Sequence, residues 1–558
     1  MTAAVPPSNR WLFGPVPDLL LGCGLLSALL FVAFAFVDGD VPARQAPVVF
    51  PLVVLLLSYP HYGATILRVY ERREDRQNYF LFSVWATVAV AAFFVLGVYS
   101  TLVASVMVTV YLTWSPWHYT GQNYGLAVMF LRRRGVEIGP REKRFVYASF
   151  ILSYVLTALV MHGGTESVDY ALSSPSGGDI HFTAIGIPAP VEAVLFPLAL
   201  LAYLGATAAA VVLLLRRGSV RDLAPAGMLM LTQALWFSLP MLARHFEITT
   251  GLVPIDWDFR FYFFTWIAAG HAVQYLWVTS YYARAEGRAH GPLRFYGKTL
   301  LGGTLLFVPP VILFGPGGLG SVSLDAGLAL LVSAGVNIHH FILDGAIWKL
   351  RSGRIANILI RNTRPEPVAD GPGSQTAMGW GSKALWATAA LALAIHGYTM
   401  WQERVALVAA AQESDLVRMS EILDQLAWVS RDHERIRSIV AAAWLEQEQL
   451  PEALREFERS VALRPTVAGY SAIAQLHERL GRPALGIPAY ESALALEPDR
   501  LGILHRLGAA WVRQQRPARA IPYLERAVAL DPEHEPSRRT LTVAREMQAR
   551  PQAATPTP

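Results

Sequence analysis

The stretch Asn337-Ile338-His339-His340-Phe341-Ile342-Leu343-Asp344 lies inside an apolar run from about Leu324 to Trp348. Ionisable side chains in an apolar helix of membrane length are costly, so they usually face the interior of a helix bundle and mark a functional site. On a helix, His340 and Asp344 share one face because they are four residues apart, whereas His339 points roughly 100° away. The stretch therefore predicts a buried helix that carries chemistry on one side.

The composition predicts a membrane protein with a soluble part attached. Of the 558 residues, 53% are hydrophobic and 16% are charged, whereas soluble domains carry about 25% charged residues. The single cysteine, Cys23, excludes a disulfide framework and a thiolate metal cluster. The formal net charge of +5 is modest, and no basic surface with interleaved aromatic residues suggests nucleic acid as a partner.

Apolar runs of roughly 20 residues, the length that spans a membrane, recur along residues 1–401. About eleven are predicted, near 17–37, 46–67, 79–99, 101–131, 145–162, 191–215, 225–246, 259–283, 296–316, 322–348 and 383–401. The predicted fold class is all-α, a polytopic transmembrane helix bundle. A segment rich in proline, glycine and serine over 362–381 is predicted to be a linker in the cytoplasm.

Basic residues follow every second predicted span, and the alternate loops are poor in lysine and arginine. Basic loops stay in the cytoplasm, so the amino terminus is predicted to be cytoplasmic. An odd number of spans then places everything after Trp401 in the periplasm or outside the cell. The predicted location is the inner (plasma) membrane.

The carboxyl-terminal part contains an internal repeat. Pro465, Pro498 and Pro532 recur at intervals of 33 and 34 residues, each after an amphipathic run. Repeats of this length predict a solenoid of helix pairs. In the most regular unit, small and apolar residues stand at Leu507, Gly508, Trp511, Ala520, Leu524, Ala527 and Pro532. The pattern resembles the tetratricopeptide-repeat family, and the resemblance implies that a groove over 434–533 binds a protein or peptide.

The soluble part is predicted to have four segments. A connecting helix over 402–433 leads into the repeats, which occupy 434–550 together with a capping helix that begins at Glu535. The alanine-, proline- and threonine-rich tail over 551–558 is predicted to be disordered.

Histidines gather at one predicted depth of the membrane part. Each of these histidines precedes the next basic residue by a similar number of positions, from seven for His61 to fourteen for His118. At about 1.5 Å per residue, they lie roughly 10–20 Å from the cytoplasmic ends of their spans. Histidines on separate helices at one depth are what a metal site in a helix bundle requires. The set comprises His61, His118, His271, His339 and His340.

The residue types favour iron. Imidazole suits iron, copper and zinc, and a neighbouring carboxylate favours non-haem iron. The five histidines and Asp344 are enough for one iron with open positions or for two. An ionised carboxylate near mid-membrane needs a cation or a proton, so Asp344 is also predicted to be catalytic. Four amides are predicted to orient the ligand rings by accepting the distal N–H, namely Gln122, Asn123, Gln274 and Asn337.

Single histidines on separate membrane helices resemble the pattern of the bacteriorhodopsin-related-protein family of integral-membrane carotene oxygenases. The resemblance rests on His61, His118, His271, His339 and His340 and covers only the membrane half. It implies histidine-bound iron that cleaves a carotenoid with dioxygen. The membrane desaturase and hydroxylase pattern of HxxxH and HxxHH clusters is a poorer match, because the only adjacent pair here is His339-His340.

The sequence therefore predicts a metal-dependent membrane oxidoreductase that acts on a lipophilic isoprenoid, carotenoid or acyl substrate and binds a partner protein through its repeats. A b-type haem protein with axial histidines is one alternative, and another transition metal could replace iron. A non-enzymatic assembly factor or transporter, in which His and Asp relay protons or bind an ion, is a further alternative. Packing alone is the simplest interpretation of any one membrane histidine. His245, which lies at another depth, and His396, which has no polar companions, are therefore left out of the predicted site.

Overall fold

The computed structural model describes residues 10–35, 49–163, 180–252, 266–287, 291–348, 353–361 and 380–549. Within these ranges the protein is helical, and its one β-bridge joins the single residues Gly163 and Ile187. The all-α prediction is confirmed for this part of the chain. The tail over 551–558 and almost all of the predicted linker lie outside the described residues. Two compact units are present, Met1–Val311 with Gly327–Met400, and Ile312–Ala326 with Trp401–Pro558.

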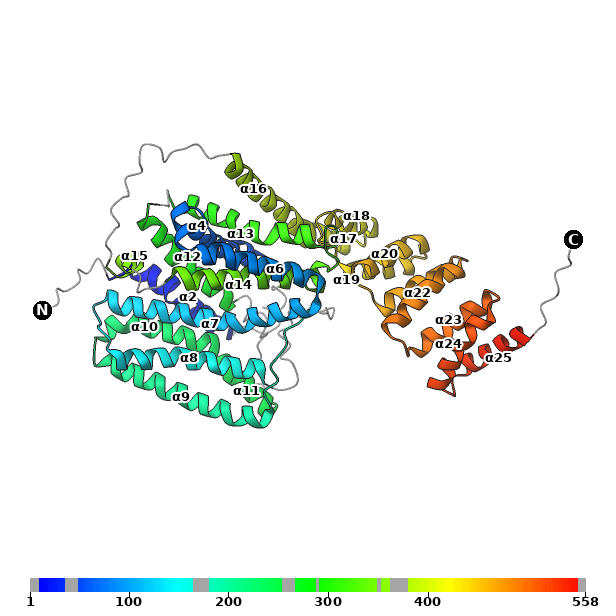
Figure 1. The fold of residues 1–558 in the computed structure, drawn as a ribbon, viewed down its shortest axis with the longest axis horizontal. Coiled ribbons are helices and arrows are strands. Elements are labelled where there is room, and N and C mark those ends of the chain that lie inside the picture. The colour runs from blue at the N-terminus through cyan, green and yellow to red at the C-terminus, as the bar shows by residue number, and fades with distance from the viewer. Residues whose placement is uncertain are drawn as a thin grey trace. The chain divides into compact units, whose positions relative to one another are not determined.

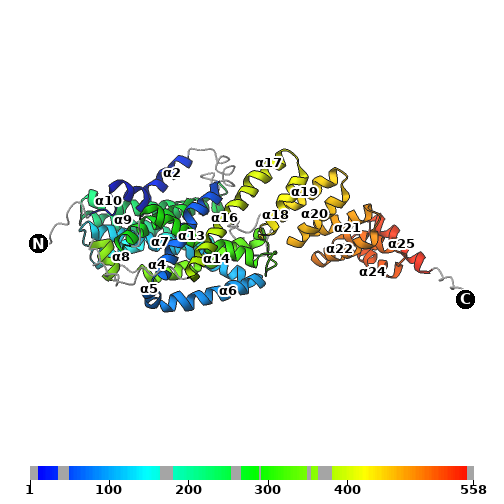
Figure 2. The ribbon, with the colours of Figure 1, turned by 90° about the horizontal axis from the view of Figure 1, so that it is seen from above.

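The first unit is a bundle of long helices that lie side by side (Figures 1 and 2). The longer helices are α2 (Leu25–Ala35), α4 (Tyr59–Tyr70), α6 (Thr87–Tyr99), α7 (Thr101–Arg133), α8 (Pro140–His162), α9 (Ala189–Leu215), α10 (Val220–Gln233), α11 (Leu239–Thr250), α12 (Ala268–Ala285), α13 (Pro292–Phe314), α14 (Ala329–Ile347) and α16 (Trp380–Trp401). Short helices and π-helical turns (η) connect them, namely α1 (Pro15–Pro17), η2 (Asp18–Gly22), η3 (Val54–Ser58), α5 (Arg73–Asn78), η4 (Leu81–Ala86), η5 (Ala234–Ser238), η7 (Leu324–Leu328), α15 (Gly353–Ala356) and η8 (Asn357–Arg361).

Seven helical segments are long and apolar enough to cross a membrane, which is consistent with a membrane protein. They are Val49–Tyr70, Leu81–Tyr99, Pro140–His162, Ala189–Leu215, Val220–Glu247, Pro292–Phe314 and Ala329–Ile347. An eighth is added if Pro15–Gly22 and Leu25–Val32, which meet at a bend of 62°, form one span. The predicted count of eleven is not confirmed. The predicted span over 101–131 forms α7, whose second half is too polar to qualify, and part of the one predicted over 259–283 lies outside the described residues.

Helix α14, which carries the polar stretch, is the most buried of the seven segments, with 78% of its apolar window inside the protein. It packs against α4, α6 and α7. An interior position removes the cost of placing polar side chains against lipid. The prediction of a buried helix is therefore confirmed, and Asn337, His340 and Asp344 each expose at most 5% of their surface to solvent.

Close contact between α4 and α13 fixes the position of the helix that carries His61. A Cβ atom on Gly63 would lie 1.8 Å from the carbonyl oxygen of Thr299, and one on Gly303 would lie 1.8 Å from that of Tyr59. Small residues allow membrane helices to approach this closely. Because the contact involves residues on both sides of His61, it sets the height of that ring in the bundle.

The second unit is built from antiparallel helix pairs. After η9 (Gln402–Ala406), its helices are α17 (Leu407–Gln412), α18 (Leu416–Ala427), α19 (Glu434–Glu446), α20 (Leu450–Leu463), α21 (Val467–Arg479), α22 (Pro483–Leu496), α23 (Leu501–Arg513), α24 (Pro517–Leu530) and α25 (Glu535–Ala549). Helices α19/α20, α21/α22 and α23/α24 pack as pairs at the period of the sequence repeat. Their assignment to the tetratricopeptide-repeat family stays a prediction.

The segment before the repeats differs from the single connecting helix that the sequence predicted over 402–433. Two helical stretches are present, because the chain turns sharply at Ser414, whose φ is +55°. The Asp415 side chain then accepts a hydrogen bond from the Arg418 backbone N–H and begins α18. Aspartate at this position is a strong helix start signal, so the break was readable in the sequence.

The second unit also includes the segment over 312–326, which the sequence analysis had assigned to the membrane part. The Ser430 hydroxyl accepts a hydrogen bond from Gly317 N at 3.2 Å and donates one to Ile312 O at 3.3 Å. His433 lies between two carboxylates, with Nδ1 at 2.6 Å from Asp325 and Nε2 at 3.5 Å from Glu403. These contacts attach a segment that precedes α14 to residues beyond α16.

The contacts of His433 with Asp325 and Glu403 predict that the second unit loses stability at alkaline pH. Burial by itself would lower the pKa of His433, but Asp325 and Glu403 outweigh it and raise that pKa to about 9. Because the folded pKa exceeds the ordinary value of about 6.5, the stabilisation is complete below pH 6.5 and is lost as the pH rises through 9. We expect the melting temperature of the second unit to fall between pH 6.5 and 9.5 and to fall less in His433→Gln. An equal fall in both proteins would contradict this assignment.

Candidate metal centre

Four helices of the first unit bring their polar side chains to one point. His61 comes from α4, His118 from α7, His271 from α12, and His340 with Asp344 from α14. Two overlapping groups, His61/His271/His340 and His118/His340/Asp344, each place one ligand atom per residue within 4.8 Å of the others. The arrangement could hold a metal ion, and His340 belongs to both groups.

The imidazole rings contact one another directly. Ring centroids are 4.4 Å apart for His61 and His340, 4.8 Å for His61 and His271, and 5.0 Å for His118 and His340. Aromatic side chains hold two of the rings from outside, since Tyr119 stacks on His271 at 4.0 Å and Phe341 stacks on His118 at 4.5 Å. The rings are thus fixed by packing.

Several ring nitrogens at this point are buried and have no hydrogen-bond partner among the described residues. They are Nδ1 of His61, Nε2 of His118, both nitrogens of His271 and Nε2 of His340. Buried polar groups almost always have partners, so an unpaired group needs an explanation such as an ion. Five unpaired nitrogens on four converging rings are the donor set that a transition metal would use.

Asp344 is held with one oxygen facing the histidines. Its Oδ1 accepts hydrogen bonds from the hydroxyls of Tyr275 at 2.7 Å and Thr65 at 3.1 Å. Its Oδ2 lies 3.4 Å from Nε2 of His340 and 3.8 Å from Nε2 of His118. One oxygen is therefore used for positioning, and the other faces the two imidazoles, where it could bind a cation together with them.

Thr65 also determines which nitrogen of His340 faces the cluster. Its hydroxyl lies 2.9 Å from Nδ1 of His340. The same hydroxyl donates to Asp344 at 3.1 Å and lies 2.6 Å from the Tyr275 hydroxyl, so it holds Nδ1 of His340 on the outer side and leaves Nε2 facing Asp344 Oδ2. Trp348 adds a hydrogen bond from its indole N–H to the Tyr275 hydroxyl at 3.1 Å. Such outer partners orient metal ligands and raise their basicity.

Removal of these outer partners should weaken metal binding without removing a ligand. We expect Tyr275→Phe and Thr65→Val each to lower metal affinity by about 10–100-fold, the usual effect of losing an outer partner. Competition with a chromophoric chelator measures the affinity. Tyr282→Phe is the matched control, because that hydroxyl bonds Arg68. An unchanged affinity in both outer-partner variants would show that Asp344 is not a ligand.

These outer partners were not predicted, although the sequence carries a signal for them. Thr65 follows His61 by four residues, Tyr275 follows His271 by four, and Trp348 follows Asp344 by four. Residues at this spacing lie one above the other on a helix. The hydroxyls of Thr65 and Tyr275 and the indole of Trp348 therefore lie one helical turn beyond these three candidate ligands and on the same helix faces.

The four predicted amides make other hydrogen bonds than those expected. Gln122 donates to Gln274 at 3.0 Å, and Asn123 donates to Gln233 at 3.0 Å. Asn337 accepts from the Tyr62 hydroxyl at 2.7 Å. Gln122 and Gln274 thus connect α7 and α12 directly and hold His118 and His271 at a fixed separation. The amides stabilise the helices that carry the ligands, whereas hydroxyls hold the ligand groups themselves.

His339, which was predicted to be a ligand, is turned away from the other histidines. Its Nε2 lies 2.9 Å from the Thr87 hydroxyl and 3.4 Å from that of Tyr70. The change of direction of about 100° per helical residue explains the difference from His340. His245, outside the predicted set, stacks on Phe196 and lies 3.5 Å from Glu192.

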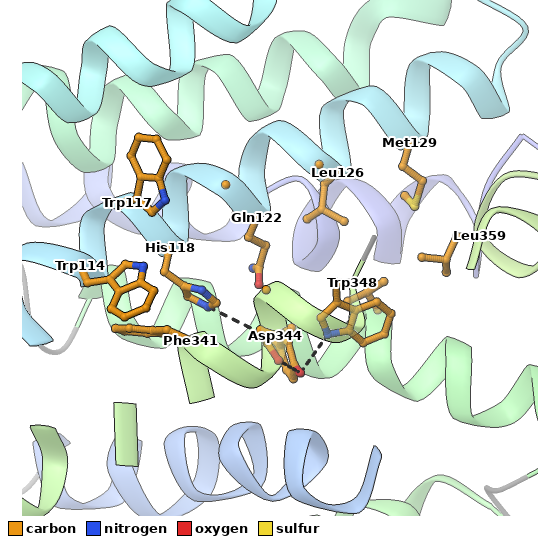
Figure 3. A pocket seen from close by; sticks show the side chains of 15 residues that line it. Trp114, Trp117, His118, Gln122, Leu126, Met129, Phe341, Asp344, Trp348 and Leu359 are labelled. Atoms are coloured by element: carbon orange, nitrogen blue, oxygen red, sulfur yellow. Dashed lines mark hydrogen bonds and ion pairs between the residues drawn. The ribbon is translucent and has the colours of Figure 1, made fainter. Parts of the chain in front are cut away.

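Two cavities adjoin the cluster. The larger, of about 340 Å³, has His118 and Asp344 in its wall together with Gln122, Tyr275 and Trp348 (Figure 3). The smaller, of about 120 Å³, is lined by hydroxyl and amide groups that include Tyr62, Tyr119 and Asn337. Both cavities are mainly apolar, and each has a few polar groups in its wall.

The fold and the cluster together define an all-helical protein with several membrane-length helices and a buried His/Asp group that could hold a metal ion. No protein-family model matches this chain, and no curated protein matches it.

Proposed function

We propose that the protein is an integral-membrane, non-haem iron oxygenase of the inner membrane that acts on a lipophilic isoprenoid, carotenoid or acyl substrate. The observation that carries the proposal is the set of buried ring nitrogens without a hydrogen-bond partner on His61, His118, His271 and His340, with Asp344 Oδ2 directed at two of them. Histidines with one carboxylate and open positions favour non-haem iron over zinc or copper. One or two irons fit the two overlapping ligand groups.

Oxidative cleavage of a carbon–carbon double bond is the reaction that needs the fewest further components. Dioxygen and the alkene react so that the O–O and C=C bonds break and two C=O bonds form. All atoms and electrons balance without an added reductant. The iron would supply redox chemistry when bound, and the chain supplies the rest: buried ligands, an apolar cavity and exclusion of water.

The protein's own groups would keep the carboxylate in one orientation during the reaction. Tyr275 and Thr65 bind one oxygen of Asp344, so its other oxygen stays directed at His118 and His340. Preorganised hydrogen bonds of this kind avoid reorganisation during the chemical step.

The haem alternative is disfavoured by the ring spacing. The ring centroids of His61 and of His118 each lie 4.4–5.1 Å from those of His271 and His340, which leaves no room for a porphyrin within any of these four pairs. A transporter or assembly factor has no specific contact in its favour. For the second unit, which follows the membrane part, the proposal is that its repeats bind a protein or peptide on the periplasmic or extracellular side.

Elemental analysis and an optical spectrum of full-length protein purified in detergent test the proposal. We expect about one or two irons per chain without a Soret band, and consumption of dioxygen when a polyene lipid is added. A Soret band would replace the proposal with a haem protein. A folded protein without any transition metal would overturn the oxygenase proposal and favour a scaffold or transporter.

A further inference from the structure

The wall of the larger cavity, called the channel below, extends along α7. It runs from Trp114 to Met129 on that helix, fifteen residues or about 22 Å at 1.5 Å per residue. Its volume of about 340 Å³ is at the lower end of the range of about 300–1,000 Å³ for ligand pockets. A space so long with so small a volume accommodates one extended chain and not a bulky ring system.

Three glycines keep one side of the channel open. A Cβ atom on Gly121, Gly125 or Gly345 would meet no atom within 4 Å. Gly121 and Gly345 are exposed, and Trp117 beside them is 40% exposed. With the bundle in a membrane, as the proposed function has it, this opening between α7 and α14 faces the lipid. A ligand can therefore enter sideways from the membrane.

The polar groups of the channel lie in its middle, and both ends are apolar (Figure 3). Trp114 and Phe341 form one end, and Met129 and Leu359 form the other. Between these two ends, His118 and Asp344 of the candidate metal centre form part of the channel wall. A chain in this channel would place an internal bond at the centre, with hydrocarbon on both sides of that bond.

We propose that the channel binds one acyclic, unsaturated hydrocarbon chain of a membrane lipid, which enters past Gly121 and Gly345 and presents an internal double bond to the metal centre. The inference rests on the proposed function, because it names the substrate class of the same centre. Gly121 and Gly125 are the specificity-determining positions, since any side chain there would fill the channel.

Binding of cis-parinaric acid, a linear conjugated polyene, to full-length protein in nanodiscs of saturated phospholipid tests this inference. Three tryptophans, Trp114, Trp117 and Trp348, line the channel, so energy transfer from them to the polyene reports binding. We expect Gly125→Leu and Gly121→Leu to weaken binding by at least about tenfold, or 1.4 kcal/mol. Gly205→Leu on α9 is the matched control, because a Cβ there also meets no atom within 4 Å, and binding should be unchanged.

Retinol, a polyene that ends in a ring, provides the second arm. We expect it to bind at least about tenfold more weakly than parinaric acid. Equal affinity of the glycine variants and the wild type, or displacement of parinaric acid by retinol at equal concentration, would overturn the inference. Gly121→Leu, at an exposed position, keeps the test decisive if Gly125→Leu does not fold.

The assay is performed on chelator-treated protein, so its outcome does not depend on iron. If no metal is found but parinaric acid binds as expected, the oxygenase proposal fails and the lipid channel stands. If iron is bound but the glycine variants bind parinaric acid normally, only the lipid channel fails.

Discussion

Replacement of His340 by alanine is expected to remove the metal from the protein, whereas the same replacement at the adjacent His339 is expected to leave metal content unchanged. His340 belongs to both ligand groups, and its Nε2 is buried without a partner. His339 instead lies beside Thr87 at 2.9 Å. Loss of a direct ligand should lower metal affinity by more than the 10–100-fold effect of losing an outer partner. We therefore expect less than about a tenth of the wild-type iron to remain in His340→Ala.

The two variants form a matched pair, since each removes one imidazole from the same turn of α14. Iron per chain by mass spectrometry, together with the elution profile of the detergent-solubilised protein, gives the readout. Equal loss of iron in both variants would show that helix packing and not ligation explains the result. Retention of iron in His340→Ala would show that His340 is not a ligand shared by the two groups.

Replacement of Arg437 by methionine is expected to destabilise the second unit by about 3–5 kcal/mol, the cost of breaking a buried ion pair from one side. Arg437 is 1% exposed and binds Glu456 at 2.6 Å, Asp432 at 2.8 Å and Asp424 at 2.9 Å. Glu456 is fully buried, and without Arg437 it would keep only the longer contacts with the half-exposed Arg455 at 3.3 Å and Arg459 at 3.9 Å. Hydrogen exchange over residues 434–463 of the full-length protein measures the change.

Arg526→Met is the control for this prediction. Its partner Asp499 is at 2.7 Å, but both side chains are at least half exposed. Exposed pairs contribute about 0.2–1 kcal/mol, so the control should stay near wild type. Comparable exchange in the two variants would mean that water reaches the Arg437 cluster.

The candidate metal ligands could be predicted from the sequence because histidine and aspartate are rare in apolar helices. His61, His118, His271, His340 and Asp344 all came from that argument, and the structure brings them together. The spacing of His340 and Asp344 was enough to place both on one face. Depth along a helix is read directly from residue number, which explains why the convergence could be anticipated.

Rotation about the helix axis was harder to predict than depth. The sequence could not decide which of His339 and His340 faces the other helices, because both lie at the same height and the choice depends on neighbouring side chains. The amides at Gln122 and Asn123 were misassigned for the same reason. Residues 312–326 belong to the second unit because they contact residues more than a hundred positions later in the chain. Gly317 and Ser430, for example, are 113 positions apart.

That separation has a consequence for biogenesis. At about 5–20 residues per second, the ribosome reaches Ser430 roughly 6–23 s after it has made Gly317, 113 positions earlier. During this interval the segment before α14 is made without its partners, although α14 and α16 are synthesised before Ser430. Completion of that segment is therefore a late event in folding, and a chain released early would expose an unfinished surface to quality control.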